Sequence, residues 1–348
     1  MEIKTQVVET IEGRPITQIR LMNDQDVEAT FLILGATWQS FLVPTATSEK
    51  KNLILGFDRP SDYLKNSLCA GQSIGRVAGR IDGGKAKVGG KEIQLPQNEK
   101  GNCLHGGFKG FHKQVWHYET YQDPDAVSVK MTYLAKEAVD GFPGDMTVEV
   151  NFILDNTNKL DITYHAYNIT ADTLFNPTSH VYFNLSRHQH LKTQSLTLQS
   201  DAYLESREDV VPTGKVLAVE GTGYDFRTGQ NLEQALERTG GLDDAFIVSP
   251  SLEVPQVTLK DTESGDCIKM YSDRNAFVVY TMNSVESGVY PSRDAGQPAK
   301  AYEAIALEAQ TLPDAINHEG FGDIMIKQGN NVAYTISCLY SNSIDGSG

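Results

Sequence analysis

Apolar and polar residues alternate one by one along much of this chain, which is the two-residue period of a β-strand. The alternation is clearest in segments that are bounded by glycine or by polar turn residues. These predicted strands cover residues 29–34, 38–43, 127–134, 146–154, 159–167, 257–259, 277–282 and 331–339. In addition, Gly89-Gly90 separates Lys85–Val88 from Lys91–Leu95, which predicts a hairpin with a two-residue loop.

Helical patterns are short and occur only at Pro60–Leu64 and Asn231–Glu237. Many strands with turn residues between them predict an all-β fold, a large antiparallel β-sandwich or a barrel. The chain has no strand–helix–strand alternation and no glycine-rich phosphate loop, so we expect no nucleotide cofactor. No linker or shift in composition divides the chain, and we expect residues 1–348 to form a single domain.

The charge of the chain narrows the classes of partner. With 30 basic and 45 acidic residues the formal net charge is -15, which disfavours nucleic acids and anionic membranes as partners. Neither a signal peptide nor a transmembrane run is recognisable. Cysteines occur singly, without metal-ligand spacing, so we expect reduced thiols and a cytoplasmic protein. They are Cys69, Cys103, Cys267 and Cys338.

One histidine stands out because it lies within an apolar, strand-like run. His180 is followed by Val181, Tyr182 and Phe183 in the segment Asn176–Leu185. Its ordinary pKa of about 6.5 suits proton transfer near neutral pH. On these residues alone, a buried histidine that hydrogen-bonds a backbone carbonyl is the commoner interpretation.

Four further segments carry polar residues that a β scaffold does not need. Each also has a plainer interpretation: a surface arginine, a glycine turn, an Asx turn or a strand face in contact with solvent. The candidates in these segments are Arg76 and Arg80, His105, Asp243 and Asp244, and Glu308 with Gln310. A pair of nearby histidines, His188 and His190, lacks a third ligand, so we expect no metal site.

Taken in order, these segments resemble the aldose 1-epimerases, the galactose mutarotases. The resemblance rests on Leu104-His105-Gly106-Gly107, on the Asn176–Leu185 run, on Tyr224–Arg227 and on the Glu308/Gln310 segment before Pro313-Asp314. It extends over nearly the whole chain, from Leu34-Gly35-Ala36 onward. It implies a large antiparallel β-sandwich with a sugar bound in an open cleft on one sheet.

The resemblance also implies roles for five residues. Glu308 corresponds to the general base and His180 to the general acid, while His105 lies near the reacting end of the sugar. Arg80 and Asp243 correspond to residues that hold sugar hydroxyls. No cofactor is implied.

Two positions depart from the family pattern. Many members carry asparagine where this chain has Gly79, and histidine where it has Asp244. Neither position transfers protons, so we expect the departures to affect hydroxyl recognition and thereby the preferred sugar.

Anomer exchange requires one group that donates a proton to the ring oxygen and one that accepts a proton from the C1 hydroxyl. A protonated His180 and an ionised Glu308 meet this requirement, and we expect a bell-shaped pH profile whose acid limb belongs to the carboxylate and whose basic limb belongs to the imidazolium. The carboxylate favours the imidazolium, whereas burial disfavours it. Glycoside hydrolases normally use a pair of carboxylates, and near Glu308 no second carboxylate lies in an equally distinctive motif, which disfavours this class of enzyme.

Two other functions remain open on the sequence. A hexose-6-phosphate epimerase needs an arginine cluster for the phosphate, and Arg76 lies near Arg80. A non-catalytic sugar-binding module on the same fold does not need the His180 and Glu308 pair. The expected partner is a small sugar. The sequence leaves open which sugar is preferred and whether the chain is a monomer or a homodimer.

Overall fold

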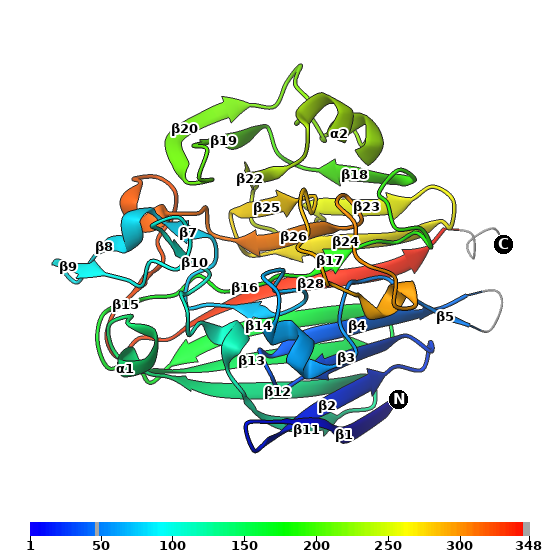
Figure 1. Cartoon of the computed structure of the whole chain (residues 1–348), viewed down its shortest axis with the longest axis horizontal. Helices are drawn as coiled ribbons and strands as arrows, with labels where there is room; N and C mark the ends of the chain where they lie inside the picture. The colour runs from blue at the N-terminus through cyan, green and yellow to red at the C-terminus, as the bar shows by residue number, and fades with distance from the viewer. Residues whose placement is uncertain (46–48, 344–348) are drawn as a thin grey trace.

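The computed structural model of the chain describes residues 1–45 and 49–343. Its largest element is a nine-stranded antiparallel sheet (Figure 1). In spatial order its strands are β11 (His117–Gln122), β12 (Ala126–Ala135), β13 (Met146–Asp155), β14 (Lys159–Tyr167), β28 (Val332–Asn342), β24 (Asp266–Ser272), β23 (Val257–Asp261), β18 (Gln194–Leu198) and β21 (Gln230–Asn231).

A five-stranded and a six-stranded antiparallel sheet form the second layer. The five-stranded sheet contains β1 (Glu2–Ile11), β2 (Arg14–Met22), β3 (Glu28–Leu32), β4 (Thr37–Pro44) and β5 (Lys50–Asn52) in sequence order. The six-stranded sheet contains β17 (Tyr182–Phe183), β26 (Ile305–Gln310), β25 (Ala276–Tyr280), β22 (Asp243–Ile247), β19 (Ala202–Ser206) and β20 (Pro212–Ala218) in spatial order. A bridge between Ile54 and Phe183 joins these two sheets edge to edge.

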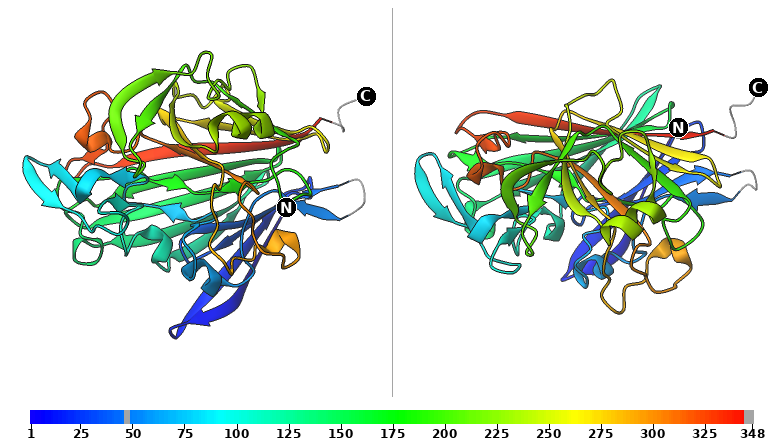
Figure 2. Two further views of the ribbon diagram at one scale, coloured as in Figure 1. Left: turned by 45° about the horizontal axis from the view of Figure 1, so that its top comes forward. Right: turned by 90° about the horizontal axis from the view of Figure 1, so that it is seen from above.

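The described residues also form four two-stranded sheets, two short α-helices and five short 3-10 helices. The strand pairs are β6 (Ser73–Ile74) with β16 (Thr178–Ser179), β7 (Arg80–Ile81) with β10 (Cys103–Leu104), β8 (Lys85–Val88) with β9 (Lys91–Gln94), and β15 (Thr173–Leu174) with β27 (Met325–Ile326). The helices are α1 (Glu137–Asp140) and α2 (Leu232–Thr239). In the left view of Figure 2, the β1–β2 hairpin (blue) and the β8–β9 hairpin (cyan) extend away from the layers.

The core lies between the two layers because each long strand buries every second side chain. In β13 and β14, buried residues alternate with half-buried ones along the whole strand. The ring centroids of Phe31 in β3 and Phe152 in β13 are 4.4 Å apart, so the five-stranded sheet packs directly on the nine-stranded sheet. Each fully buried side chain of this size contributes about 1.5–3 kcal/mol to stability. The all-β sandwich expected from the sequence is therefore confirmed.

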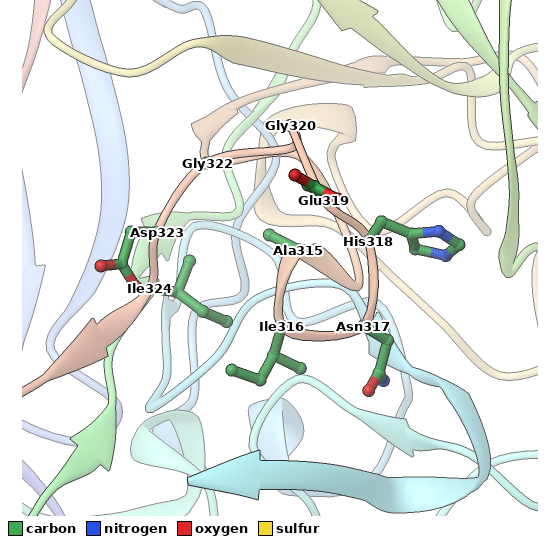
Figure 3. A pocket seen from close by; sticks show the side chains of 9 residues that line it. All are labelled: Ala315, Ile316, Asn317, His318, Glu319, Gly320, Gly322, Asp323 and Ile324. Atoms are coloured by element: carbon green, nitrogen blue, oxygen red, sulfur yellow. The ribbon is translucent and has the colours of Figure 1, made fainter. Parts of the chain in front are cut away.

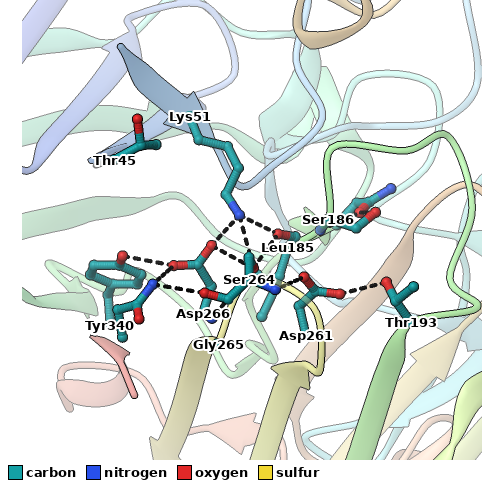
Figure 4. A network of polar contacts seen from close by, with 12 residues as sticks. Thr45, Lys51, Leu185, Ser186, Thr193, Asp261, Ser264, Gly265, Asp266 and Tyr340 are labelled. Atoms are coloured by element: carbon teal, nitrogen blue, oxygen red, sulfur yellow. Dashed lines mark hydrogen bonds and ion pairs between the residues drawn. The ribbon is translucent and has the colours of Figure 1, made fainter. Parts of the chain in front are cut away.

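A buried ionic network ties the edge of the five-stranded sheet to the nine-stranded sheet (Figure 4). The ammonium of Lys51 in β5 pairs with Asp266 at the start of β24 and donates to the carbonyl of Leu185 over 2.6 Å. Tyr340 in β28 donates to the same carboxylate over 2.8 Å. Because buried charges are tolerated when they are paired and hydrogen-bonded, this network fixes the end of the segment that contains His180.

Most predicted elements are present with slightly different ends. The Gly89-Gly90 hairpin forms with Val88 opposite Lys91, and both glycines have positive φ. The predicted helix at Asn231–Glu237 is α2, where the Asn231 side chain accepts from the Gln234 N–H and caps the helix. The segment Pro60–Leu64 is a 3-10 helix. All four cysteines are buried free thiols.

Candidate active site

The floor of the candidate site is the outer face of the six-stranded sheet. On β26, Ile305, Leu307 and Ala309 point into the main core. Glu308 and Gln310, which alternate with these residues along the strand, point the opposite way and line a cleft of about 370 Å³. The alternation along this strand is as the sequence predicts, and the polar face looks into the cleft rather than into open solvent.

The structure brings together all five residues that the sequence assigned to chemistry or binding. They line the same cleft, and they come from five separate segments of the chain. They are Arg80, His105, His180, Asp243 and Glu308.

His180 lies between two short strands, not within a continuous one as expected. It follows β16 and precedes β17, and its backbone bonds to the loop before β6: its N–H donates to Gln72 O over 3.0 Å and its carbonyl accepts from the Gly71 N–H over 2.8 Å. Its side chain is buried, and Nε2 lies 3.4 Å from Oε1 of Glu308. Tertiary hydrogen bonds thus override the strand pattern here and aim the ring at β26.

Polar side chains on both sides of His180 fix its segment to β26, the strand that contains Glu308. The Thr178 hydroxyl donates to the carbonyl of Ala309 over 2.8 Å. The Asn184 amide donates to the carbonyl of Glu303 over 2.6 Å. Because these contacts lie on either side of the Glu308 position, they hold the two proton-transfer candidates at a fixed separation.

Asn176, at the start of the same segment, extends this attachment. Its amide donates to the carbonyl of Thr311 over 3.0 Å, and its side-chain oxygen accepts from the Thr311 N–H over 2.9 Å. The buried guanidinium of Arg274 donates to both side chains, at 2.5 Å to Asn176 and 2.6 Å to Thr311. The asparagines and the threonine of the sequence motif therefore serve to position His180.

Pairing of β7 with β10 places Arg80 and His105 side by side, with Leu104 opposite Arg80 in the register. Nδ1 of His105 accepts from the Gly79 N–H over 3.2 Å. A neutral imidazole that accepts at Nδ1 carries its proton on Nε2. His105 is therefore a hydrogen-bond donor at the cleft, and its ring centroid is 5.2 Å from that of His180.

The glycine after His105 is required by a close backbone approach. Gly106 has φ 81°, and a Cβ at this position would lie 1.9 Å from the carbonyl oxygen of Gly75. No side chain fits there, so the turn that presents the histidine needs glycine.

Arg80 has a partner that the sequence did not indicate. Its Nε and Nη2 contact the carboxylate oxygens of Glu99 at 3.1 and 3.4 Å, and Glu99 also lines the cleft. This paired geometry fixes the plane of the guanidinium. Glu99 lies in a polar turn whose composition resembles any surface turn, so the sequence carried no signal for it.

Gly79 and Asp244, the two positions that depart from the family pattern, lie differently relative to the cleft. Gly79 lines the cleft, and a Cβ there would contact the Pro313 side chain at 3.2 Å. Asp244 follows Asp243 on β22 and accepts from the Asp243 N–H, and Asp243 but not Asp244 lines the cleft. The expected effect of Asp244 on hydroxyl recognition therefore has no direct contact to support it, whereas that of Gly79 is consistent with its position.

Burial moves the pKa values of the central pair in opposite directions. It raises the pKa of Glu308 to about 8, assisted by the charge of Asp243 and opposed by Arg80. It lowers the pKa of His180 to about 4. Both shifts favour neutral forms, so the free pair carries its single proton on Glu308 at neutral pH. The expected assignment of the acid limb to the carboxylate and the basic limb to the imidazolium stays a prediction, because the limbs of such a coupled pair belong to both groups together.

Several polar atoms at the floor of the cleft lack a protein partner. These are Nδ1 of His180, Oε2 of Glu308, and both amide atoms of Gln310. Buried polar atoms without a partner are costly, about 1–3 kcal/mol each. Their concentration at one place indicates a site that is completed by a ligand rich in hydroxyl groups.

A larger hollow of about 590 Å³ lies elsewhere and does not offer this chemistry. It is an open hollow lined by the loop of residues 315–324, and Figure 3 shows the side chains of Asn317 and His318 pointing away from the loop. Nε2 of His318 pairs instead with Asp314 at 3.4 Å.

Among the described residues, no three His, Cys, Asp or Glu side chains form a metal-binding group. No helix among residues 1–45 and 49–343 is long and apolar enough to cross a membrane.

Comparisons with known proteins identify the family of this chain. The family model described as aldose 1-epimerase matches residues 17–338. The chain is 46% identical to an aldose 1-epimerase from Streptococcus thermophilus, over 99% of both chains. It is 37% identical to a maltose epimerase from Levilactobacillus brevis, over 98% of this chain and 99% of the relative. The crystal structure of galactose 1-epimerase from Lactobacillus acidophilus superposes with a TM-score of 0.85 at 26% identity, covering 98% of this chain and 99% of that chain. The chain belongs to the aldose 1-epimerase family.

Proposed function

We propose that this enzyme interconverts the α and β anomers of a free aldohexose, with Glu308 as the general base and His180 as the general acid. The contact of 3.4 Å between His180 Nε2 and Glu308 Oε1 on the floor of the cleft is the observation that carries the proposal. At this separation the two groups can reach O1 and O5, the two oxygens that are bonded to C1 of one sugar.

The reaction needs only proton transfers. Glu308 accepts the proton of the C1 hydroxyl while His180 donates a proton to the ring oxygen O5. The C1–O5 bond breaks, its electron pair goes to O5, and C1 becomes an aldehyde. Rotation about C1–C2 and closure with the reverse transfers give the other anomer. Each positioned transfer contributes about 10²–10⁴-fold to the rate.

The resting pair can enter this cycle because it shares the same number of protons as the active pair. The active form, imidazolium with carboxylate, holds one proton, as does the resting form, imidazole with carboxylic acid. The two interconvert when one proton moves between His180 and Glu308, across the 3.4 Å contact. Proton transfers at O1 and O5 can therefore begin without uptake or loss of a proton from solvent.

Three further groups would hold the sugar in a fixed position relative to Glu308 and His180. Arg80 and the Nε2–H of His105 offer donors, and the carboxylate of Asp243 offers an acceptor. Burial raises the pKa of Asp243, and the charge of Arg80 opposes this shift. These groups surround the pair, so they would fix C1 and O5 relative to the base and the acid.

The hexose-6-phosphate alternative is weaker, because Arg76 is fully buried and occupied. Its Nε pairs with Asp140 at 2.7 Å, and its Nη1 donates to the Gly144 carbonyl over 2.7 Å. Among the described residues that line the cleft, the cationic groups are Arg80, already paired with Glu99, and Lys100. A dianionic phosphate would thus lack the arginine cluster that it needs.

Polarimetry on freshly dissolved α-D-glucose and α-D-galactose tests the proposal directly. We expect the enzyme to accelerate the decay of optical rotation for at least one of these sugars. Decay at the uncatalysed rate with both sugars would contradict the proposed activity. Acceleration with hexose 6-phosphates alone would favour the phosphate alternative.

Removal of either binding group should weaken both binding and turnover. Loss of a charged hydrogen bond costs roughly 1.5–3 kcal/mol, so Arg80→Ala and Asp243→Ala should each lower kcat/KM by about 10- to 100-fold. Steady-state kinetics on the preferred hexose measures this effect. Arg227→Ala is the matched control, because that arginine forms an ion pair with Asp225 at 2.7 Å and does not line the cleft. Unchanged kinetics in both cleft variants would place the sugar elsewhere.

Metal removal should have no effect, since every proposed step is a proton transfer between protein and sugar. We expect full mutarotase activity after dialysis against a strong chelator, measured by polarimetry without added metal. Activity that is lost on chelation and restored by a divalent cation would contradict the proposed mechanism. His188 and His190, whose rings stack at 5.0 Å, would then be the first ligands to test.

A further inference from the structure

We infer that Arg207 is a positioning residue of the sugar site. It holds the loop of residues 207–211, between β19 and β20, against the β7–β10 strand pair. The held loop closes the wall of the cleft on the side remote from Glu308. The inference rests on the proposed function, because it takes this cleft to be the place where the sugar binds.

The loop and its two flanking residues form part of the cleft. Ser206 at the end of β19, Val210 in the loop and Pro212 at the start of β20 all line it. Three strand steps separate β19 from β26, which contains Glu308. At the usual spacing between strands these steps amount to about 14 Å. When C1 is held at Glu308, the loop therefore meets the end of the hexose that does not react.

Arg207 reaches from the loop to the segment that directly follows β7. Its Nη1 and Nη2 donate to the two carboxylate oxygens of Asp82 over 2.9 and 2.8 Å. Its Nε and Nη2 donate to Asp209, within the loop, over 3.0 and 2.9 Å. The guanidinium is thus paired with two carboxylates at once, and this geometry fixes the position of the loop relative to Asp82.

A second contact joins the loop to the start of β10. Asn102 is buried directly before this strand, and its amide donates to the carboxylate of Asp209 over 3.1 Å. Asp82 lies two residues after Arg80, and Asn102 lies three residues before His105. The contacts of the loop with Asp82 and Asn102, which we call the latch, therefore connect it to both segments that present sugar-binding groups.

The loop needs this latch because its backbone is strained. Val210 has φ 62°, in the left-handed region that a β-branched residue rarely adopts. Such a conformation costs free energy and persists only where the surrounding structure imposes it. The ion pairs of Arg207 offset this cost and keep the Val210 side chain at the cleft. Without the latch, we expect the loop to relax away from the cleft.

The latch is exposed, so it can open without unfolding of the sandwich. The side chains of Arg207 and Asp82 are 41% and 46% exposed. Exposed ion pairs contribute little to the stability of the whole fold, and salt weakens them. Because a hexose carries no charge, a dependence of its KM on salt reports on charges of the protein. The KM for a neutral sugar therefore provides a readout of the latch.

Removal of Arg207 tests the inference without a change in any group that lines the cleft. Arg207→Ala should raise the KM for the preferred hexose about 3- to 10-fold, because a loop that is closed only part of the time lowers the apparent affinity. Its kcat should stay within about twofold, since the loop contacts a part of the sugar that does not react.

Two further measurements separate the latch from a general structural role. Between about 0.05 M and about 1 M NaCl the KM of the wild type should rise, whereas that of Arg207→Ala should stay constant. Asp82→Ala should raise KM by about as much as Arg207→Ala, and the double variant should show no further rise, because both substitutions break the same interaction.

Arg227→Ala is the matched control, since Arg227 also pairs with two carboxylates, those of Asp201 and Asp225, which lie outside the loop. Its KM should match the wild type at both salt concentrations. Thermal unfolding should show that each variant is folded. Amide hydrogen exchange of residues 207–211, measured without sugar, should be faster in Arg207→Ala than in the wild type.

An unchanged KM in Arg207→Ala, additive effects of Arg207→Ala and Asp82→Ala, or a loss confined to kcat would overturn the latch and leave the proposed function intact. A wild-type protein that is inactive on every hexose would overturn the proposed function. Hydrogen exchange would then still decide whether Arg207 holds the loop, and equal exchange in Arg207→Ala and the wild type would overturn that as well.

Discussion

Replacing Glu308 with glutamine should lower kcat by at least about 100-fold, because the amide keeps the shape of the side chain but cannot accept the C1 proton. The remaining partner cannot compensate. Burial lowers the pKa of His180 to about 4, so near neutral pH its ring is a neutral imidazole, whose remaining N–H is too weak an acid to protonate the ring oxygen. Stopped-flow polarimetry or a coupled dehydrogenase assay that is specific for one anomer measures the loss.

A second buried carboxyl group on the approach to the same strand provides a matched control. Burial also raises the pKa of Glu303 to about 8, and that residue is fully buried five positions before Glu308. Glu303 does not line the cleft, so Glu303→Gln should retain most of the turnover. Both variants should remain folded in thermal unfolding, since Glu308→Gln removes an ionisable group whose charged form is disfavoured by burial. Near-normal turnover in Glu308→Gln would mean that another group is the base.

Strands that bury one face were predictable from the sequence because burial imposes the alternation. β13 and β14 lie in the middle of the nine-stranded sheet, and the predicted bounds of 146–154 and 159–167 differ from the observed ones by at most one residue. By contrast, every residue of β1 is exposed or only half-buried. No periodic pattern is then required of that strand, and it went unpredicted.

The candidate site was predictable as a set of residues but not as a geometry. His180 and Glu308 are far apart in sequence, and their 3.4 Å contact depends on tertiary hydrogen bonds such as that from Thr178 to the Ala309 carbonyl. The sequence also suggested a continuous strand through His180, where the chain instead bonds to the loop before β6. Glu99 was not recognisable, because only the fold shows that it contacts Arg80.

Burial likewise determines the order of the pKa values, which no sequence pattern contains. The carboxylate–imidazolium attraction favours an ion pair, yet both groups are buried in the floor of the cleft, where the neutral forms are favoured. The exposed fraction of the Glu308 side chain is 3% and that of His180 is 7%. Such burial is a property of the packed sheets and of the loop before β6, which are formed by residues far from either group.

The pH dependence of the wild-type enzyme should be bell-shaped in kcat/KM, since the active pair holds one proton. Activity should fall below about pH 4, where the pair gains a second proton, and above about pH 8, where it loses its only one. These limbs belong to the pair and do not reveal which group is the acid. A flat profile between pH 4 and pH 9 would show that the pair does not control the rate.

Replacing His180 with asparagine separates the two roles. With one titrating group left in the pair, residual activity depends on Glu308 alone, whose pKa is raised by burial. A general base acts when it is ionised, so the residual rate should be at least about 100-fold lower than that of the wild type and should rise with pH, without the decline on the basic side. His105→Asn should be milder and should keep both limbs, because His105 acts as a hydrogen-bond donor through Nε2.

If the residual rate of His180→Asn instead falls as the pH rises, Glu308 acts in its protonated form and the acid and base roles are exchanged. If His105→Asn loses the basic limb while His180→Asn keeps it, the acid is His105. The direction of this single limb decides the assignment because it reports the protonation state in which the surviving carboxyl group works.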